Sequence, residues 1–189
     1  MTPRTPRISA IRVQPVGGAV ELEGLDELAA TLAGVFRVSC HVESAELDAS
    51  FAFDSLRGQY HSTAILGRLQ GGDAEDPAAR VLGVTELDLF VPVLTFVFGE
   101  AQLAGRCALV SLHRLREEFY GLPPKPDLLR ERAAKESVHE LGHTLGLRHC
   151  PDWRCVMAST HAVERLDLKS AGFCTRCARA AGLAPSPEP

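Results

Sequence analysis

Residues 139–149 read HELGHTLGLRH, a spacing of histidines that has few uses in proteins. His139 and His143 are four residues apart, so on a helix both imidazoles project from one face, about one turn apart. Glu140 lies about 100° around the helix from His139, where it can reach a metal-bound water without binding the metal itself. This spacing predicts a zinc-binding helix.

The motif falls at the end of a helix that we expect from Leu128 to Leu145, with Asp127 as its N-cap. Apolar residues at steps of three and four predict the face that packs on the core: Val138, Leu141 and Leu145. Gly146 can end the helix with a positive φ and let the chain turn back sharply. His149 can then supply a third nitrogen, and three histidines with one open position are typical of a catalytic zinc site.

Four of the six cysteines gather in the last quarter of the chain, in two short-spaced pairs. Cys150 and Cys155 are separated by four residues, and Cys174 and Cys177 by two. Four thiolates at such spacings suit a tetrahedral structural zinc. The last pair alone could be a redox site, and four ordinary thiols are the simpler alternative.

The zinc helix, the third histidine after a glycine, and Met157 shortly downstream resemble the metzincin metalloproteases. The cysteines resemble the archaemetzincin family in particular. In that family a cysteine directly follows the third histidine, as in His149-Cys150, and another precedes the Met-turn methionine, as in Cys155-Val156-Met157. The matched stretch, from His139 to Cys177, covers about a fifth of the chain.

The resemblance implies a role for each matched residue. The ligands of a catalytic zinc would be His139, His143 and His149. Glu140 would be the general base and acid, and Met157 would form a hydrophobic floor beneath the metal. The ligands of a second, structural zinc would be Cys150, Cys155, Cys174 and Cys177, which gives two Zn²⁺ per chain.

Strands and helices alternate through the first 120 residues, which predicts an α/β layer structure. The expected strands are residues 8–16, 38–43, 80–90, 93–98 and 107–112, and the expected helices are residues 24–36 and 58–69. Residues 93–99, VLTFVFG, also resemble the edge strand that faces the substrate in archaemetzincins. The fold class expected is α/β (α+β) and metzincin-like, a mixed twisted sheet with flanking helices and an active-site helix.

We expect a single catalytic domain over residues 1–189. Its N-terminal α/β subdomain would span residues 1–146 and end with the zinc-binding helix. A small zinc-stapled C-terminal subdomain, residues 147–183, would hold the Met-turn and the four cysteines. Residues 184–189 would form a disordered tail.

The chain has 189 residues, 46% of them hydrophobic and 23% charged, and a formal net charge of −4. This balance argues against nucleic acid as a general partner. No apolar run is long enough to cross a membrane, and the N-terminus lacks the apolar stretch of a secretory signal. We therefore expect a cytoplasmic monomer that acts on a peptide or protein substrate.

Charged and histidine residues outside the motif carry weaker signals. Glu117, Glu118 and residues 130–132 are expected on solvated helix faces. Among the remaining histidines, His161 is the one expected near a substrate pocket, because it follows Met157 closely.

The main hypothesis is a zinc metallopeptidase that hydrolyses peptide bonds through a zinc-activated water, with Glu140 as general base and acid. An extended peptide would lie along an edge strand of the sheet. Two alternatives stay open, namely a two-zinc module that binds a peptide or partner without cutting it, and an enzyme that hydrolyses a non-peptide amide. Glu140 favours an enzyme, because a binding scaffold has no need of that base.

Overall fold

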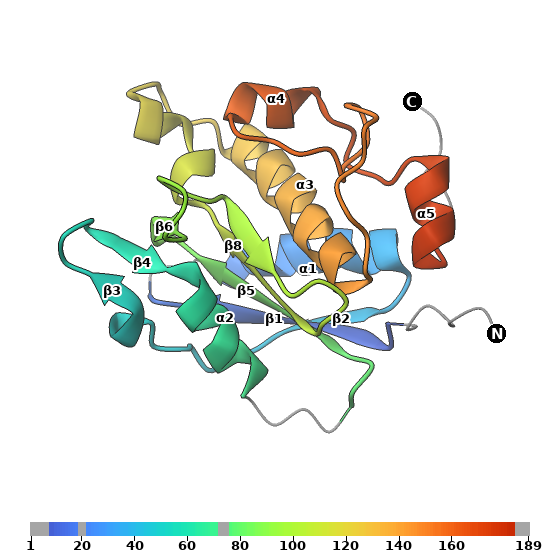
Figure 1. Ribbon diagram of the computed structural model, residues 1–189, viewed down its shortest axis with the longest axis horizontal. Coiled ribbons are helices and arrows are strands. Elements are labelled where there is room, and N and C mark those ends of the chain that lie inside the picture. Colours follow the sequence, from blue (N-terminus) through green and yellow to red (C-terminus); the bar gives the residue numbers. More distant parts are fainter. Residues whose placement is uncertain (1–7, 19–21, 72–75, 184–189) are drawn as a thin grey trace.

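The structure, a computed structural model, describes residues 8–18, 22–71 and 76–183. Within these residues, a five-stranded sheet has the order β2-β1-β5-β8-β7 (Figure 1). Its strands are β1 (Ala10–Val16), β2 (Ser39–Val42), β5 (Arg80–Thr85), β7 (Gly99–Ala101) and β8 (Cys107–Ser111). The pairs β1/β2, β1/β5 and β5/β8 are parallel, whereas β7 runs antiparallel to β8 and forms the edge of the sheet.

A second, three-stranded sheet of the described chain is made of very short strands, β3 (Phe53–Asp54), β4 (Gln59–His61) and β6 (Leu89–Phe90). Strand β4 pairs antiparallel with β3 and parallel with β6. Strand β6 begins shortly after β5 ends, so the predicted strand over residues 80–90 is in fact two strands in different sheets.

The prediction of a strand over residues 93–98 is wrong. This segment turns instead, with the amide of Leu94 donating to the carbonyl of Val91, and only Val97 makes an isolated bridge, to Leu89. Side chains from the small sheet satisfy part of its backbone: Arg57 donates to the Leu94 carbonyl and Gln59 to the Thr95 carbonyl. The edge strand is therefore β7, which begins at Gly99, the last residue of the predicted segment.

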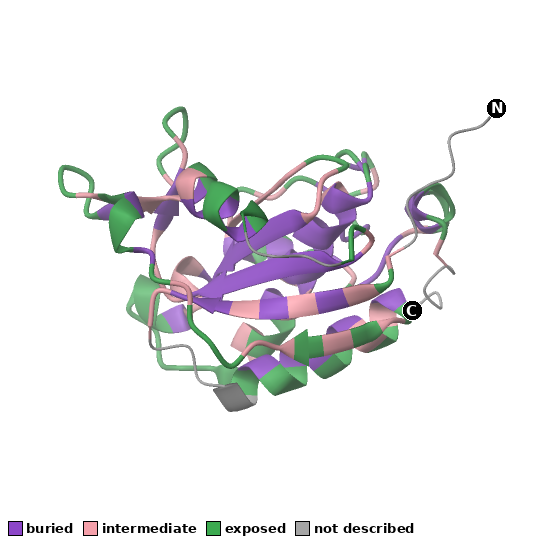
Figure 2. Cartoon of the chain, turned by 90° about the horizontal axis from the view of Figure 1, so that it is seen from below, coloured by how far each residue is buried: buried purple, intermediate pink, exposed green. Residues whose placement is uncertain are grey.

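Two helices cover one face of the main sheet and a third covers the other (Figure 1). Helices α1 (Leu22–Phe36) and α3 (Pro126–Thr144) pack against each other and on the sheet, and α2 (Ser62–Gln70) packs on β8, β7 and β5 from the opposite side. Figure 2 shows the central strands buried, between helices whose outer surfaces are exposed.

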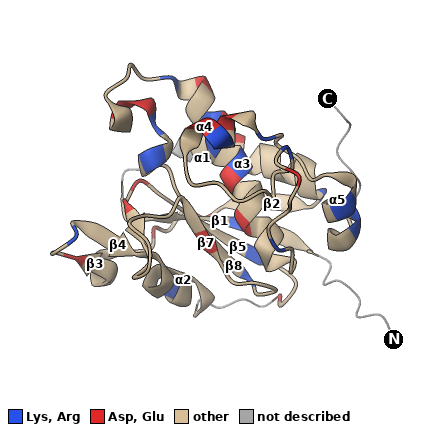
Figure 3. Ribbon diagram, turned by 45° about the horizontal axis from the view of Figure 1, so that its top comes forward, with Lys and Arg blue, Asp and Glu red and all other residues tan. Residues whose placement is uncertain are grey.

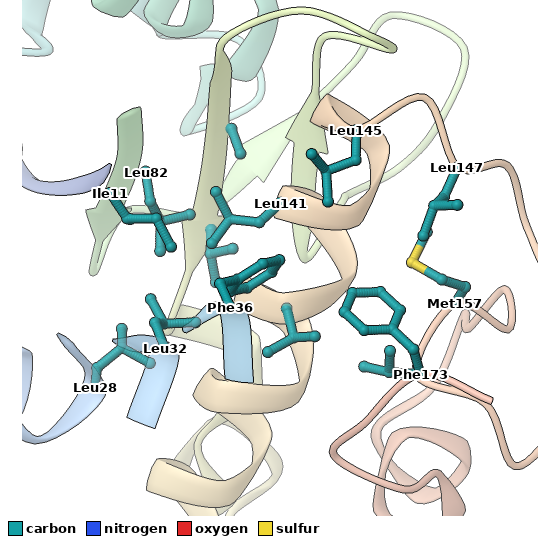
Figure 4. Close-up of a cluster of buried hydrophobic side chains, with 14 of the residues drawn as sticks. Ile11, Leu28, Leu32, Phe36, Leu82, Leu141, Leu145, Leu147, Met157 and Phe173 are labelled. Atoms are coloured by element: carbon teal, nitrogen blue, oxygen red, sulfur yellow. The ribbon is translucent and has the colours of Figure 1, made fainter. Parts of the chain in front are cut away.

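The larger core lies between the sheet and the α1/α3 layer. Leu141 points from α3 toward Ile11 and Leu82 of the sheet, while Met157 and Phe173 lie on the other side of the same helix (Figure 4). Helix α3 is thus buried from two sides, and one continuous core joins the α/β part to the segment that follows it.

That C-terminal segment begins where Gly146, at φ +83°, ends the turn after α3, as predicted from the sequence. It contains two short helices, α4 (Val163–Leu168) and α5 (Thr175–Ala181), and packs on α3 mainly through α4. Among the described residues, none of the helices has both the length and the apolar character that a membrane span requires.

Other differences from the expected elements are local. Helix α3 begins at Pro126, whose missing N–H is no loss at the first helical position, and Lys125 rather than Asp127 occupies the N-cap. Short 3₁₀ turns, which the sequence pattern did not indicate, lie at Ser50–Ala52, His113–Leu115 and Glu117–Tyr120. The tail expected to be disordered, residues 184–189, lies outside the described residues.

Two charged residues expected on solvated faces are buried. Arg132 is only 3% exposed and forms ion pairs with Glu117 at 2.8 Å and with Asp167 at 2.7 Å. These pairs tie α3 to the turn before it and to α4 after it. In Figure 3, acidic and basic positions accordingly occur together where α4 lies over α3.

Candidate active site

Helix α3 and the turn after it bring the three predicted histidines together. One ring nitrogen from each of His139, His143 and His149 lies within 4.8 Å of the other two. His139 is buried, His143 is half-buried and His149 is exposed, so the cluster opens toward solvent on the side of His149. The helical spacing accounts for the first pair, and the left-handed turn at Gly146 returns the chain so that His149 can approach them.

Backbone carbonyls fix how the first two imidazoles are protonated. Nδ1 of His139 lies 2.8 Å from the carbonyl of Val156, and Nδ1 of His143 lies 2.8 Å from the carbonyl of Leu147. A carbonyl can only accept, so each neutral ring carries its proton on Nδ1 and leaves Nε2 as an acceptor. This is the orientation that carbonyl partners impose on metal-binding histidines.

The two Nε2 atoms of His139 and His143 then face each other at 3.1 Å with no hydrogen between them. Burial lowers the pKa of His139 to about 3 and also lowers the pKa of His143 and of His149, so the rings are neutral near pH 7. A tetrahedral zinc with Zn–N bonds of about 2.05 Å separates its nitrogens by about 3.3 Å. The residues present therefore fit a zinc ion, and a cation removes the repulsion between the two lone pairs.

Glu140 is buried beside this cluster, together with Glu136 one turn earlier on α3. Burial raises the pKa of Glu140 well above its usual range, and the nearby carboxyl of Glu136 raises it further. Burial likewise raises the pKa of Glu136 to about 7. Raised carboxyl pKa values are what a group that takes up and returns protons near neutral pH requires.

The histidines and both glutamates line an open cleft of about 650 Å³. The opposite wall consists of residues 94–101, that is, the turn before β7 and β7 itself. Arg148, His161 and Lys169 also line the cleft, so the expectation that His161 lies near a substrate pocket agrees with its position. This volume lies within the range of ordinary small-molecule and peptide pockets.

Met157 lies under the helix turn that carries the histidines and is fully buried. Gly142 makes this packing possible, because a Cβ atom there would lie 2.4 Å from Sδ of Met157. The amide of Cys150 donates to the carbonyl of Met157, so this segment also connects the packing beneath the histidine helix with the cysteines.

The four cysteine sulfurs form a second cluster in which all atoms lie within 4.8 Å of one another. Sγ of Cys150 and Sγ of Cys174 are 3.9 Å apart. A tetrahedral zinc with Zn–S bonds of about 2.3 Å separates its sulfurs by about 3.8 Å, whereas a disulfide requires about 2.05 Å. The cluster therefore fits a closed zinc site of four thiolates.

The sequence profile of peptidase family M54 matches residues 24–181 of this chain, a range that contains both clusters. The chain belongs to this family. The archaemetzincin of Methanocaldococcus jannaschii is 46% identical over 170 residues, which cover 90% of this chain and 91% of that protein. As an archaemetzincin, the chain is a zinc metallopeptidase, and the resemblance and fold class predicted from the sequence are confirmed.

Solved structures agree with this assignment. The archaemetzincin of Archaeoglobus fulgidus, crystallised with malonate, has a TM-score of 0.78 at 37% identity and covers 90% of this chain and 99% of its own. A zinc-dependent peptidase of Methanocorpusculum labreanum has a TM-score of 0.82 at 28% identity, with coverages of 90% and 99%.

Sequence reasoning missed two residues of this archaemetzincin site. Glu136 precedes Glu140 by four residues and His139 by three, so helical periodicity alone could have placed it on the same face. Lys169 follows α4 and comes from a segment without a periodic pattern that points to the cleft.

Proposed function

We propose that this archaemetzincin hydrolyses peptide bonds with one zinc held by His139, His143 and His149. When bound, that zinc supplies a Lewis acid that activates water and polarises the scissile carbonyl. The observation that carries the proposal is the pair of Nε2 atoms 3.1 Å apart, both unprotonated because their Nδ1 atoms donate to backbone carbonyls. A metal cation between the two lone pairs makes this arrangement favourable.

Glu140 acts as the general base and then as the general acid. It takes a proton from the attacking water and returns it to the leaving amine. Its burial and its raised pKa support this role, because a carboxyl in such surroundings holds a proton more readily than an exposed one and can pass it on. Met157 forms the hydrophobic floor beneath the three histidines.

The outer edge of β7 receives the substrate as an extended strand. The carbonyl of Phe98 accepts from Ser111, and the amide of Gln102 donates to Cys107, so alternate residues of this strand bond to β8. The backbone groups of Gly99 and Ala101 then point away from β8 along the wall of the cleft. A peptide can pair with these backbone groups as an added strand. This pairing would align the peptide across the three histidines, which line the same cleft.

The four cysteines hold a second zinc with a structural role, which gives two zinc ions per chain. The spacing of 3.9 Å between Cys150 and Cys174 supports it. This site fastens the segment that contributes His149, since Cys150 follows that residue directly.

The proposal is tested with a broad panel of peptides and with protein that has been stripped of its labile zinc. We expect cleavage by the zinc-loaded protein, loss of cleavage after chelation and recovery when zinc is returned. Cleavage that persists after the histidine site has been emptied would contradict it. Peptide binding without cleavage by zinc-loaded protein would favour the alternative, a two-zinc module that recognises peptides without cutting them.

A further inference from the structure

Lys169 is a buried cation whose surroundings are acidic. Its side chain lies at the end of α4, is only 5% exposed and lines the same cleft as Glu136 and Glu140. Burial lowers the pKa of Lys169, but the charges of the two carboxyls oppose this effect. A buried ammonium is costly without negative charge nearby, and the two carboxyls that line the same cleft supply that charge.

The two buried carboxyls are in turn stabilised by the positive charge of Lys169. Both are buried one turn apart on α3, where like charges repel each other. Among the described residues, Oε2 of Glu136 has no hydrogen-bond partner. The positive charge of Lys169 lowers the pKa of both groups against the effect of burial. Lys169 is thus the cation that balances the pair containing the proposed general base.

Lys169 also contacts the backbone that orients a histidine. Its Nζ lies 3.3 Å from the carbonyl of Val156, and the same carbonyl accepts from Nδ1 of His139 at 2.8 Å. One carbonyl oxygen therefore receives two donors, one from the C-terminal segment and one from the active-site helix. Movement of the lysine side chain would therefore change both the electrostatic surroundings of the carboxyl pair and the orientation of His139.

We propose that Lys169 is a positioning residue of the active site, whose ammonium balances the buried Glu136–Glu140 pair and holds the Val156 carbonyl that orients His139. The effect on activity rests on the proposed function of Glu140. Lys169 does not need to touch the substrate, and its role is to hold the carboxyl pair and the Val156 carbonyl in their positions.

Lys135 provides a matched control. It is also a buried lysine, and its Nζ donates to the carbonyls of Leu166 and Asp167 and pairs with Glu131 at 2.6 Å. It joins α3 to the end of α4, whereas Lys169 joins the end of α4 to Val156, and it does not line the cleft. A merely structural role of Lys169 would make the two lysines equivalent.

The experiment compares Lys169→Met, Lys135→Met, Glu136→Gln and the double variant Lys169→Met/Glu136→Gln, all loaded with zinc. For Lys169→Met we expect kcat on a cleavable peptide to fall by about 30-fold or more, with KM changed by less than about twofold, because the base and not the binding surface is disturbed. For Lys135→Met we expect kcat to change by less than about threefold.

The double variant tests charge balance directly. Glu136→Gln removes one negative charge and leaves Glu140 as the remaining carboxyl. The kcat of the double variant should therefore be at least about tenfold higher than that of Lys169→Met alone. The melting temperature, which needs no activity, should follow the same pattern: Lys169→Met lowers it and Glu136→Gln restores most of the loss.

Equal loss of kcat in the two lysine variants, or no recovery of kcat and melting temperature in the double variant, would overturn the proposal. If the parent cleaves no peptide, the proposed function fails, but the melting temperatures of the variants still test whether Lys169 balances the carboxyl pair. Recovery in the double variant then supports the charge balance, and its absence refutes it.

Discussion

Gly99 of the edge strand and Glu140 of the active-site helix are in direct contact. A Cβ atom built on Gly99 would lie 2.7 Å from Cγ and 3.0 Å from Oε1 of Glu140, and 2.7 Å from the backbone carbonyl of Leu109. The backbone of β8 cannot retreat, so any side chain at this position must displace the glutamate. The close approach of β7 to α3 therefore fixes where the proposed base lies relative to a peptide on that strand.

Gly99→Ala should consequently reduce kcat/KM for peptide cleavage by about 10–100-fold, the usual effect of misplacing a reacting group by about 1 Å. Zinc content should stay unchanged, because no histidine is touched. Gly67→Ala is the control, since a Cβ there meets nothing within 4 Å, and alanine in helix α2 should raise stability by up to about 1 kcal/mol. Full activity of Gly99→Ala would contradict the claim that the contact with Gly99 fixes the position of Glu140 for catalysis.

Arg132 joins α3 to its neighbours from a buried position. Arg132→Met should lower the free energy of unfolding by about 1–3 kcal/mol, because Asp167 loses its ion pair and the Leu115 carbonyl its buried donor, while Glu117 keeps its pairing with Lys125. Arg130→Met removes a neighbouring arginine that is half exposed, and should change stability by less than about 1 kcal/mol. Denaturant unfolding of both variants measures the difference, and equal effects would contradict the role of burial.

Cys174→Ser should lower the zinc content from two ions to one and loosen residues 150–180, while the α/β part stays folded. Limited proteolysis should then cut this segment, as mass spectrometry of the fragments can show. Cys40→Ser is the matched control, because Cys40 lies outside the four-cysteine cluster. An unchanged zinc content and digestion pattern in Cys174→Ser would argue against a structural zinc.

The pH dependence of the zinc-free protein should reveal the buried His139. Its pKa is about 3 in the folded protein and 6.5 in the unfolded chain, so between these values only the unfolded chain binds the proton. The free energy of unfolding of the parent should therefore fall as the pH falls from 6.5 toward 3, by about 1.4 kcal/mol per pH unit from this residue.

His139→Gln lacks this titration and serves as the reference for that measurement. The stability difference between parent and variant, both free of zinc, should change with pH in this window and be constant above it. A difference that does not depend on pH would mean that His139 is protonated as easily in the folded protein as in the unfolded chain.

The sequence was sufficient to predict that the histidines and the cysteines gather in two clusters, because the members of each cluster are close in the chain. Helical geometry places His139 beside His143, and the short spacings of the cysteines leave few ways to arrange them. The long helices were also predictable, since α1 and α3 present continuous apolar faces.

The cleft wall could not be predicted, because its elements form through tertiary contacts. Strand β7 has only three residues and no alternating apolar pattern, so its position depends on pairing with β8. The apolar residues before it suggested a strand, but they pack in turns. Arg132 lies in a run of charges that gives no sign of burial, and only the arrival of α4 places Asp167 beside it.

The most direct test of the account is Glu140→Gln, measured beside the parent for peptide cleavage and zinc content. Glutamine keeps the size of the side chain but cannot take up the proton, so hydrolysis should fall by about 10²–10⁴-fold while both zinc ions remain. His143→Ala should instead lose the zinc of the histidine site and the activity together. If the parent cleaves peptides and Glu140→Gln, with its zinc in place, cleaves them equally well, Glu140 is not the base and the proposed mechanism is wrong.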